Sequence, residues 1–294
     1  VMSLSGITGL TFTSGDGTSD ATMTFSGTQS AINTALNGLT YAPNANYNGS
    51  ASIQIQTTDG SLTDTDTVNI TVNAVNDAPV NTVPSTQTIN EDTNLVFNSS
   101  NGNLISVNDV DNTNVTVTLT STNGVLSLSG ITGLSFTNGD GTSDSTMTFS
   151  GTQSAINTAL NGLTYAPNAN YNGSATVQIQ TTDGSLTDTD TVNITVNAVN
   201  DAPVNTVPSA QFVNEDTNLV FSSDNGNTIS VNDVDNADVI VTLTSTNGVM
   251  SLSGTSGLTF SSGDGFSDEA MTFSGSKAAI NNALNGLTYT PNAN

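Results

Sequence analysis

The sequence predicts an all-β protein built of tandem β-sandwich domains arranged as an elongated rod. Two observations predict this fold. The chain repeats itself with a long period, and each repeat consists of short alternating strand-like runs separated by turn residues. We expect about seven strands and one short helix in each complete repeat.

The repeat is the first of these observations. Val1, Val125 and Val249 begin equivalent copies, so the period is 124 residues, and residues 1–124 and 125–248 differ at 15 positions. Such a period exceeds the 20–50 residues of solenoid repeats and suits a small domain with its own core. We interpret the chain as a segment of a longer protein.

Proline-bearing linkers define the predicted domains. The stretch AVNDAPV occurs unchanged at 74–80 and 198–204, and proline stiffens a junction because it fixes φ. Division at these linkers gives the C-terminal part of one repeat (1–76), a complete repeat (77–200) and the N-terminal part of the next (201–294).

Within the complete repeat, strands are expected at 86–90, 104–107, 114–122, 125–129, 146–151, 174–182 and 190–198. The dipeptide Asn123–Gly124 predicts a tight hairpin between the strands on either side of it. One segment, 152–163, instead has apolar residues at helical spacing. Thr152 or Ser154 is expected to cap this short helix, and Gly162 to end it.

Composition excludes several function classes. The net charge is −24, with a single base, and the chain has no His or Cys. Ordinary zinc, haem and iron–sulfur sites and Ser-His-Asp or Cys-His catalysis are therefore ruled out. Lys277 alone cannot neutralise a row of phosphates, so nucleic acid is not an expected partner. No apolar run is long enough to cross a membrane, so we expect no membrane insertion.

The acidic residues point toward calcium. Of 25 acids only three are Glu (Glu91, Glu215 and Glu269), and Asp is the short-armed residue preferred in loops and as a ligand of hard cations. In an up-and-down or Greek-key sandwich, alternate loops return to the same end. This predicts that acids from separate loops meet at the linkers, where only a bound cation would relieve their repulsion.

The predicted ligands form two sets. One set surrounds the first linker, and the other combines the far end of the complete repeat, the second linker and the next repeat. Calcium, which accepts 6–8 oxygen ligands in irregular geometry, is the expected ion, with magnesium second. The full set is Asn76, Asp77, Glu91, Asp92, Asp109, Asp111, Asp183, Asp188, Asp190, Asn200, Asp201, Glu215, Asp216, Asp233 and Asp235.

Two further acidic stretches remain ambiguous. GDGTSD at 139–144 recurs at 15–20 and resembles either a calcium loop or a plain tight turn, since it is shorter than an EF-hand loop and lacks its final Glu. TDTDT at 63–67 is either a ligand set or the exposed face of a strand.

These motifs together resemble a known family. NED, DVDN, YNGSATVQIQTTDG and VNITVNAVNDAPV are similar to the cadherin-like tandem repeats of giant bacterial surface adhesins, the RTX-type and VCBS-like group. The resemblance implies extracellular cadherin-like or Ig-like sandwiches with calcium at their junctions. It supports Glu91, Asp92, Asp109, Asp111, Asn200 and Asp201 as ligands, and Asp183 more weakly. The repeat is longer than the usual unit of this family.

The expected function follows from these points. The chain is predicted to be a non-enzymatic extender of a secreted or cell-surface adhesin or filament, with neighbouring repeats of the same chain as its partners. One alternative is a matrix subunit that polymerises with identical chains into a fibre. Another is a calcium-dependent glycan-binding or ice-binding module, which the 5% aromatic content disfavours for sugars. The cell-surface or matrix target is not specified by the sequence.

Overall fold

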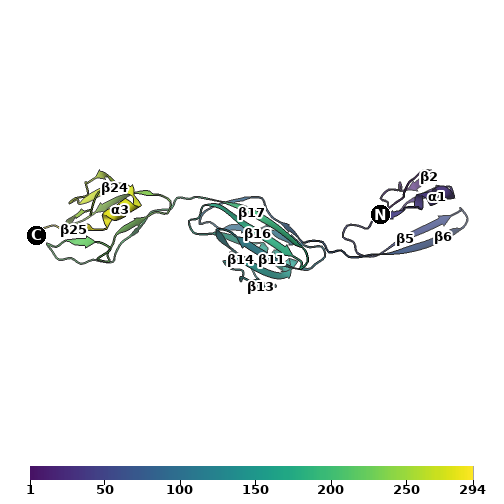
Figure 1. Cartoon of the computed structure of the whole chain (residues 1–294), viewed down its shortest axis with the longest axis horizontal. Helices are drawn as coiled ribbons and strands as arrows, with labels where there is room; N and C mark the ends of the chain where they lie inside the picture. Colours follow the sequence, from purple (N-terminus) through teal and green to yellow (C-terminus); the bar gives the residue numbers. More distant parts are fainter. Residues whose placement is uncertain (294) are drawn as a thin grey trace.

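The computed structural model describes residues 1–293. Three β-rich units follow one another along its longest axis, and the chain between them is extended (Figure 1). We call residues 1–76 the first unit, 77–200 the second unit and 201–293 the third unit. The predicted all-β fold of tandem sandwiches in a rod, with one short helix per unit, is confirmed.

The second unit contains eleven strands and one helix, which are β7 (Val80–Thr82), β8 (Gln87–Asn90), β9 (Leu95–Phe97), β10 (Ser106–Asn108), β11 (Asn114–Ser121), β12 (Gly124–Ser127), β13 (Leu134–Asn138), β14 (Thr146–Thr152), α2 (Gln153–Leu160), β15 (Leu163–Pro167), β16 (Gly173–Thr182) and β17 (Thr187–Asn197). All seven predicted strands have a counterpart among them. The short strands β7, β9, β13 and β15 were not predicted.

These strands form two facing layers. One sheet has the order β13-β14-β11-β16-β17-β8, and a smaller one has the order β12-β15-β9, with β7 and β10 paired beside them. All pairs are antiparallel except β8 with β17, which run parallel. Alternation along β11 places Val115, Val117 and Leu119 inside and threonines outside, as a half-buried strand requires.

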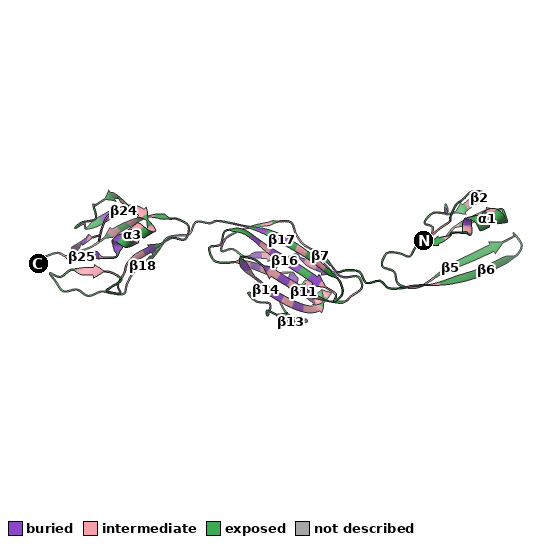
Figure 2. Cartoon of the chain, viewed as in Figure 1, coloured by how far each residue is buried: buried purple, intermediate pink, exposed green. Residues whose placement is uncertain are grey.

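The core lies between these layers, and Figure 2 shows buried positions concentrated in the second unit. Phe97, Phe149 and Tyr165 are fully buried there. The Tyr165 hydroxyl donates to the backbone oxygens of Thr122 and Asn123, each at 3.0 Å. Burial raises the pKa of Tyr165 to about 12, so the hydroxyl keeps the proton that it donates.

The predicted hairpin at Asn123–Gly124 is wrong. Strand β11 belongs to the six-stranded sheet, whereas β12 pairs with β15 in the other sheet, so this turn crosses between the layers. Asn123 does adopt a left-handed conformation, with φ of 56°. A Cβ on Gly124 would lie 2.5 Å from the oxygen of Ala166, so glycine is required by packing against β15.

The short helix forms as predicted. The Thr152 side chain accepts from the backbone N–H of Ala155 at 3.2 Å, which satisfies one of the unpaired donors at a helix start. Helix α2 lies against β10, where the Asn157 side chain accepts from the Val107 N–H and donates to its oxygen, both at 2.8 Å. The helix thereby fixes the strand that leads into the acidic loop at 108–112.

The first and third units repeat parts of this architecture. The first unit contains β1 (Met2–Ser3), β2 (Leu10–Ser14), β3 (Thr24–Gly27), α1 (Gln29–Leu36), β4 (Thr40–Tyr41), β5 (Gly49–Thr58) and β6 (Thr63–Val72). The third contains β18 (Val204–Thr206), β19 (Leu219–Phe221), β20 (Ser230–Asn232), β21 (Asp238–Thr244), β22 (Gly248–Ser251), β23 (Leu258–Ser262), β24 (Ala270–Ser276), α3 (Lys277–Leu284) and β25 (Leu287–Pro291).

Burial differs between equivalent positions of these units. Val192 on β17 is 1% exposed, but its equivalent on β6, Val68, is 58% exposed. Strands β5 and β6 pair only with one another, because residues 1–76 include no equivalent of β11. In the third unit, residues 211–214 form no strand, since the described chain offers them no partner equivalent to β17.

Candidate cation sites at the unit junctions

Each junction joins an extended linker to the acidic loop of the unit that follows it. At the first junction, the backbone N–H of Asp77 donates to Asp111 Oδ2 at 2.7 Å. Asn76 donates from Nδ2 to Asp183 Oδ2 at 2.6 Å, and its Oδ1 accepts from Asn112 at 2.9 Å. The linker residues Asn76 and Asp77 thus contact two loops that are far apart in sequence.

The loop at 108–112 is organised around Asp109. Its Oδ1 accepts from the backbone N–H groups of Asp111 at 2.8 Å and Asn112 at 2.7 Å. This is the local turn geometry that Asp favours. Asp109 is 7% exposed, and its second oxygen, Oδ2, is buried with no hydrogen-bond partner.

Helix α2 holds this loop from behind. Gln153 donates from Nε2 to the backbone oxygens of Asp109 at 2.8 Å and Asn112 at 2.5 Å. It also accepts from the Asp109 N–H at 3.1 Å. Three hydrogen bonds from one side chain therefore fix the backbone of the loop.

The remaining acids at this end have different partners. Asp188 Oδ2 accepts from the backbone N–H of Asn81 at 2.7 Å, at the base of the core. Asp190 lies opposite Ile179 in the β16–β17 ladder, one step further into the sheet. Asp183 is brought to the linker, whereas Asp188 and Asp190 lie along β17 beside it.

The far end of the second unit supplies Glu91 and Asp92. Glu91 is 3% exposed, and its Oε1 accepts from the Val199 N–H at 2.6 Å, while Oε2 is buried without a partner. Asp92 has a φ of 56°, and its Oδ1 accepts from the Asn170 N–H at 3.1 Å. Both acids therefore lie at the end of β8, beside the second linker.

The second junction repeats two of the contacts that the linker makes at the first. The Asp201 N–H donates to Asp235 Oδ2 at 2.6 Å, and Asn236 donates to Asn200 Oδ1 at 2.8 Å. Asp233 Oδ1 accepts from the N–H of Asp235 at 2.9 Å. A hollow of about 230 Å³ opens here, lined by residues of both units, among them Asn170, Asp201, Asn232 and Asp233.

The electrostatics of the second junction reflect this concentration of negative charge. Burial, followed by the charges of Asp235, Asp92, Glu91 and Asp233, raises the pKa of Asp201. Asp183 at the first junction and Asp233 at the second show the opposite shift, because donors stabilise their charge. The Asn76 side chain lowers the pKa of Asp183, and the backbone N–H of Asn236 contributes most to lowering the pKa of Asp233.

The side chains at the junctions meet only part of what a hard cation requires of its ligands. Within residues 1–293, no three His, Cys, Asp or Glu side chains are close enough together to hold a metal ion. Calcium, however, also accepts amide oxygens, backbone carbonyls and water as ligands. A buried carboxylate oxygen without a donor is costly, and Glu91 and Asp109 each present one at a junction.

Several predicted residues lie elsewhere or have local roles. Glu215 and Asp216, equivalents of Glu91 and Asp92, follow residues 211–214 at the start of the third unit, whereas Asp233 and Asp235 belong to the loop at the second linker. In the stretch at 139–144, Asp144 accepts from the N–H groups of Asp140 and Gly141 at 3.0 and 2.8 Å, which favours the tight-turn interpretation. Residues 63–67 are all exposed on β6.

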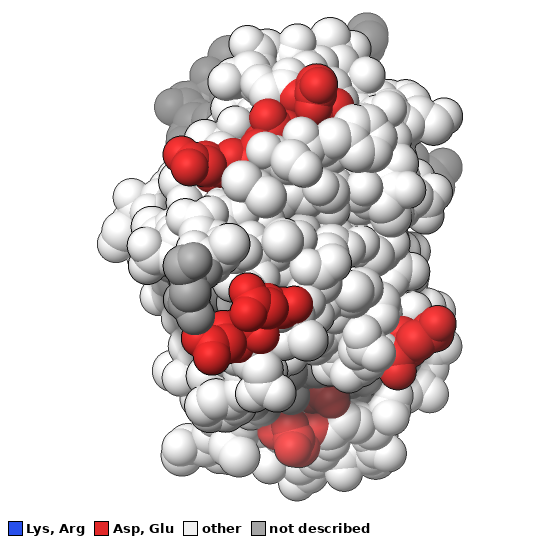
Figure 3. All heavy atoms as spheres, turned by 90° about the vertical axis from the view of Figure 1, so that its left-hand side faces the viewer, with Lys and Arg blue, Asp and Glu red and all other residues white. Residues whose placement is uncertain are grey.

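Acidic side chains also remain accessible at the end of the molecule that carries the third unit. Figure 3 shows them there as separate patches, and no basic side chain is visible on that face. This view agrees with the net charge of −24. A molecule that binds this surface must therefore accommodate its negative charge.

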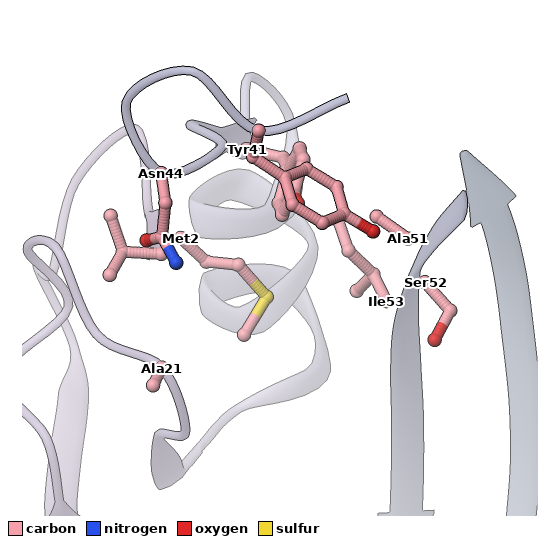
Figure 4. Close-up of a pocket in the computed structure, with 9 residues that line it drawn as sticks. Met2, Ala21, Tyr41, Asn44, Ala51, Ser52 and Ile53 are labelled. Atoms are coloured by element: carbon pink, nitrogen blue, oxygen red, sulfur yellow. The ribbon is translucent and has the colours of Figure 1, made fainter. Parts of the chain in front are cut away.

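A second hollow, of about 350 Å³, lies in the first unit (Figure 4). It is lined by Met2, Tyr41 and Ile53, among others. Tyr165, the equivalent of Tyr41 in the second unit, is fully buried in the core. The hollow is therefore the open side of a core rather than a substrate cleft.

Sequence reasoning overlooked three contributors to the junctions. Gln153, Asn112 and Asn170 are uncharged and lie outside the repeated linker sequence, so neither the acids nor the linker points to them. The DVDN motif contained a signal for Asn112, because the equivalent Asn236 recurs one period later. Gln153 falls within the segment predicted as a helix, and nothing local indicates that its side chain reaches the loop.

Comparisons with known proteins give little further guidance. No known protein family matches the chain, and no curated protein does either. Among solved structures, an endo-fucoidan hydrolase of glycoside hydrolase family 107 is 16% identical with a TM-score of 0.26, covering 94% of this chain and 34% of that one. This chain thus spans about a third of its length.

Two other solved structures are similar at the same low level. The titin domains Z1Z2 in complex with telethonin are 12% identical with a TM-score of 0.22, over 69% of this chain and 83% of that one. Domains 4–9 of the surface layer protein SbsC are 13% identical with a TM-score of 0.22, over 83% and 35% of the respective chains. Similarities this low carry no argument about function.

The described part of the chain, residues 1–293, has no helix that is both long and apolar enough to span a bilayer.

Proposed function

We propose that this chain is a non-enzymatic extender segment of a long extracellular or cell-surface filament, stiffened by calcium at its unit junctions. Its work is mechanical, since it holds whatever lies beyond it at a distance. Successive sandwiches in a row, joined by short linkers, support this proposal (Figure 1).

The observation that carries the calcium part is the pair of buried, unpartnered carboxylate oxygens. Glu91 Oε2 and Asp109 Oδ2 lie at opposite ends of one unit, each beside a linker. Buried charges are normally paired or bound to metal. A cation at each end would satisfy them and link the unit to its neighbours.

The proposed site at the second junction combines three sources of oxygen. At the second junction, the second unit offers Glu91 and Asp92, the linker offers Asp201, and the third unit offers Asp233 and Asp235. Burial, and after it the charges of Asp235, Asp92, Glu91 and Asp233, raise the pKa of Asp201. Calcium would cancel that repulsion, and amide oxygens, carbonyls and water would complete its coordination.

Stiffening follows from the linker contacts. Without a cation, the linker is held to the following unit by hydrogen bonds such as Asp201 N–H to Asp235, while Glu91 is held to the linker through Val199. An ion shared by the two units would connect Glu91 to Asp235, the residues at the two ends of this series of contacts. The angle between units would then be restricted.

Small-angle X-ray scattering tests the proposal. In 5 mM calcium the maximum dimension of the chain is expected to be larger than in chelator, and the range of dimensions that the chain samples is expected to be narrower. Magnesium is the matched divalent control. The same scattering profile in calcium and in chelator would contradict the stiffening.

A second candidate function is lateral assembly into a fibre, and the outer face of the six-stranded sheet favours it. Along β11, β14, β16 and β17, the residues that alternate with the core positions are Thr, Ser, Gln and Asn, without charge. Gln178 and Gln180 donate to threonines across this face at 3.4 and 3.3 Å.

Such a face would let two acidic chains approach without charge repulsion. Electron microscopy distinguishes the candidates, since regular multi-stranded fibres would favour assembly and single threads the extender. The face also has no aromatic side chain, which disfavours sugar stacking.

A further inference from the structure

The one basic side chain of the sequence occupies a specific place at the second junction. Lys277 begins α3, and its backbone N–H donates to Ala237 at 2.9 Å. Gln153 begins α2 in the same way, with its N–H donating to Thr113 at 2.9 Å. The two residues are equivalent, and the first unit also has a glutamine, Gln29, at this position.

Lys277 contacts its acidic loop differently from Gln153. Gln153 forms three hydrogen bonds to the loop at 108–112. The Lys277 ammonium instead donates to the backbone oxygen of Asp233, in the equivalent loop. It thus brings a positive charge into the loop that offers Asp233 and Asp235 to the junction.

The helix itself does not explain this lysine. A cation in the first turn opposes the helix dipole, whose positive end lies there. The neighbouring acids offer a reason for it, because the ammonium donates to the backbone oxygen of Asp233. This contact places a positive charge in the loop that carries two carboxylates of the proposed calcium site.

We propose that Lys277 is a built-in cation of the second junction, which neutralises part of its negative charge and weakens calcium binding there. This inference rests on the proposed calcium sites. Its consequence is that junctions with glutamine and junctions with lysine stiffen at different calcium concentrations. One substitution per repeat would then set where along a rod flexibility persists.

The size of the effect follows from simple electrostatics. A monovalent and a divalent cation within several ångströms of one another in a water-like dielectric repel enough to weaken binding about tenfold. Salt at about 0.15 M reduces this to a few-fold. We therefore expect a change in dissociation constant of about three- to tenfold, which is larger at low ionic strength.

Calorimetric titration of calcium into the whole chain tests this inference. Asp109→Asn weakens the first junction, so that the second dominates the signal. In this background, Lys277 is compared with K277Q, which restores the residue of the other repeats, and K277M, which keeps a long side chain without charge. Both variants are expected to bind calcium about three- to tenfold more tightly.

The outcomes separate the two proposals. Equal dissociation constants for all three chains would overturn the role of Lys277 while leaving calcium binding intact. Tighter binding by K277Q but not by K277M would assign the effect to the glutamine amide and also overturn it. If none of the chains binds calcium, the calcium proposal fails, and the inference about Lys277 fails with it.

Melting in chelator supplies a readout that needs no metal. There, K277M is expected to melt below the parent chain, and the difference should shrink as salt is added, because a charge that neutralises neighbouring acids has been removed. A difference that is the same at low and high salt would indicate lost packing and contradict the electrostatic role.

Discussion

Glu91 offers the sharpest test of the junction chemistry, because one substitution is expected to act in opposite directions with and without calcium. Its side chain is 3% exposed, with Oε1 held by Val199 at 2.6 Å and Oε2 unpartnered. Glu91→Gln keeps the acceptor and removes the buried charge. In chelator, removal of this uncompensated charge is expected to stabilise the second unit by about 1–3 kcal/mol.

With calcium the same change is expected to remove most of the metal-dependent stabilisation. Extracellular calcium modules bind with dissociation constants of about 10⁻⁴–10⁻³ M. At 10 mM calcium the parent chain should therefore gain about 1.4–2.7 kcal/mol at the junction. For a unit of this size, that corresponds to roughly 5–15 °C in melting temperature.

Differential scanning calorimetry in chelator and in 10 mM calcium measures both effects. The matched control is Glu269→Gln, the same substitution at an exposed glutamate, for which we expect no change in either condition. The reasoning would be refuted if E91Q melted below the parent chain in chelator, or if it gained as much from calcium as the parent does.

Three other predictions concern packing, the helix and pH. Gly124→Ala should lower the free energy of unfolding in urea by about 2–4 kcal/mol, since its Cβ would lie 2.5 Å from the backbone of β15. Gly130→Ala, whose Cβ meets nothing within 4 Å, is the control, and equal losses in the two variants would contradict the packing argument. Asn157→Ala should cost about 2–4 kcal/mol, because both backbone groups of Val107 lose their 2.8 Å partner, and a loss below about 0.5 kcal/mol would show that water replaces it. The pKa of Asp201 is raised, so its ionisation opposes folding: in chelator, Asp201→Asn should stabilise the chain more as pH rises from 3 to 7, and a benefit that is constant over this range would refute the repulsion.

Some parts of the fold could be predicted because neighbours in sequence decide them. The cap at Thr152 bonds to a residue three positions away, and the β16–β17 hairpin closes through Asp183, which accepts from Leu186 N–H at 2.7 Å. Such contacts depend on local residue types and backbone preferences. Loop parity then sufficed to place Asp111 and Asp183 at the first linker, as the hydrogen bonds to Asp77 and Asn76 show.

Other features depended on contacts that no local pattern records. The turn at Asn123–Gly124 has the composition of a hairpin, but pairing of β12 with β15 draws the chain into the opposite sheet.

By itself, the sequence determined the repeat, the strand alternation, the helix and the end of the sandwich at which the acids gather, because these follow from periodicity and chain direction. Only the tertiary structure decided which carboxylates are buried without a donor, and that Gln153 and Lys277 reach the acidic loops. Gln153 and Lys277 contact loops 44 residues earlier in the chain. Burial and such long-range contacts depend on packing between distant segments, where a given residue type has several possible partners.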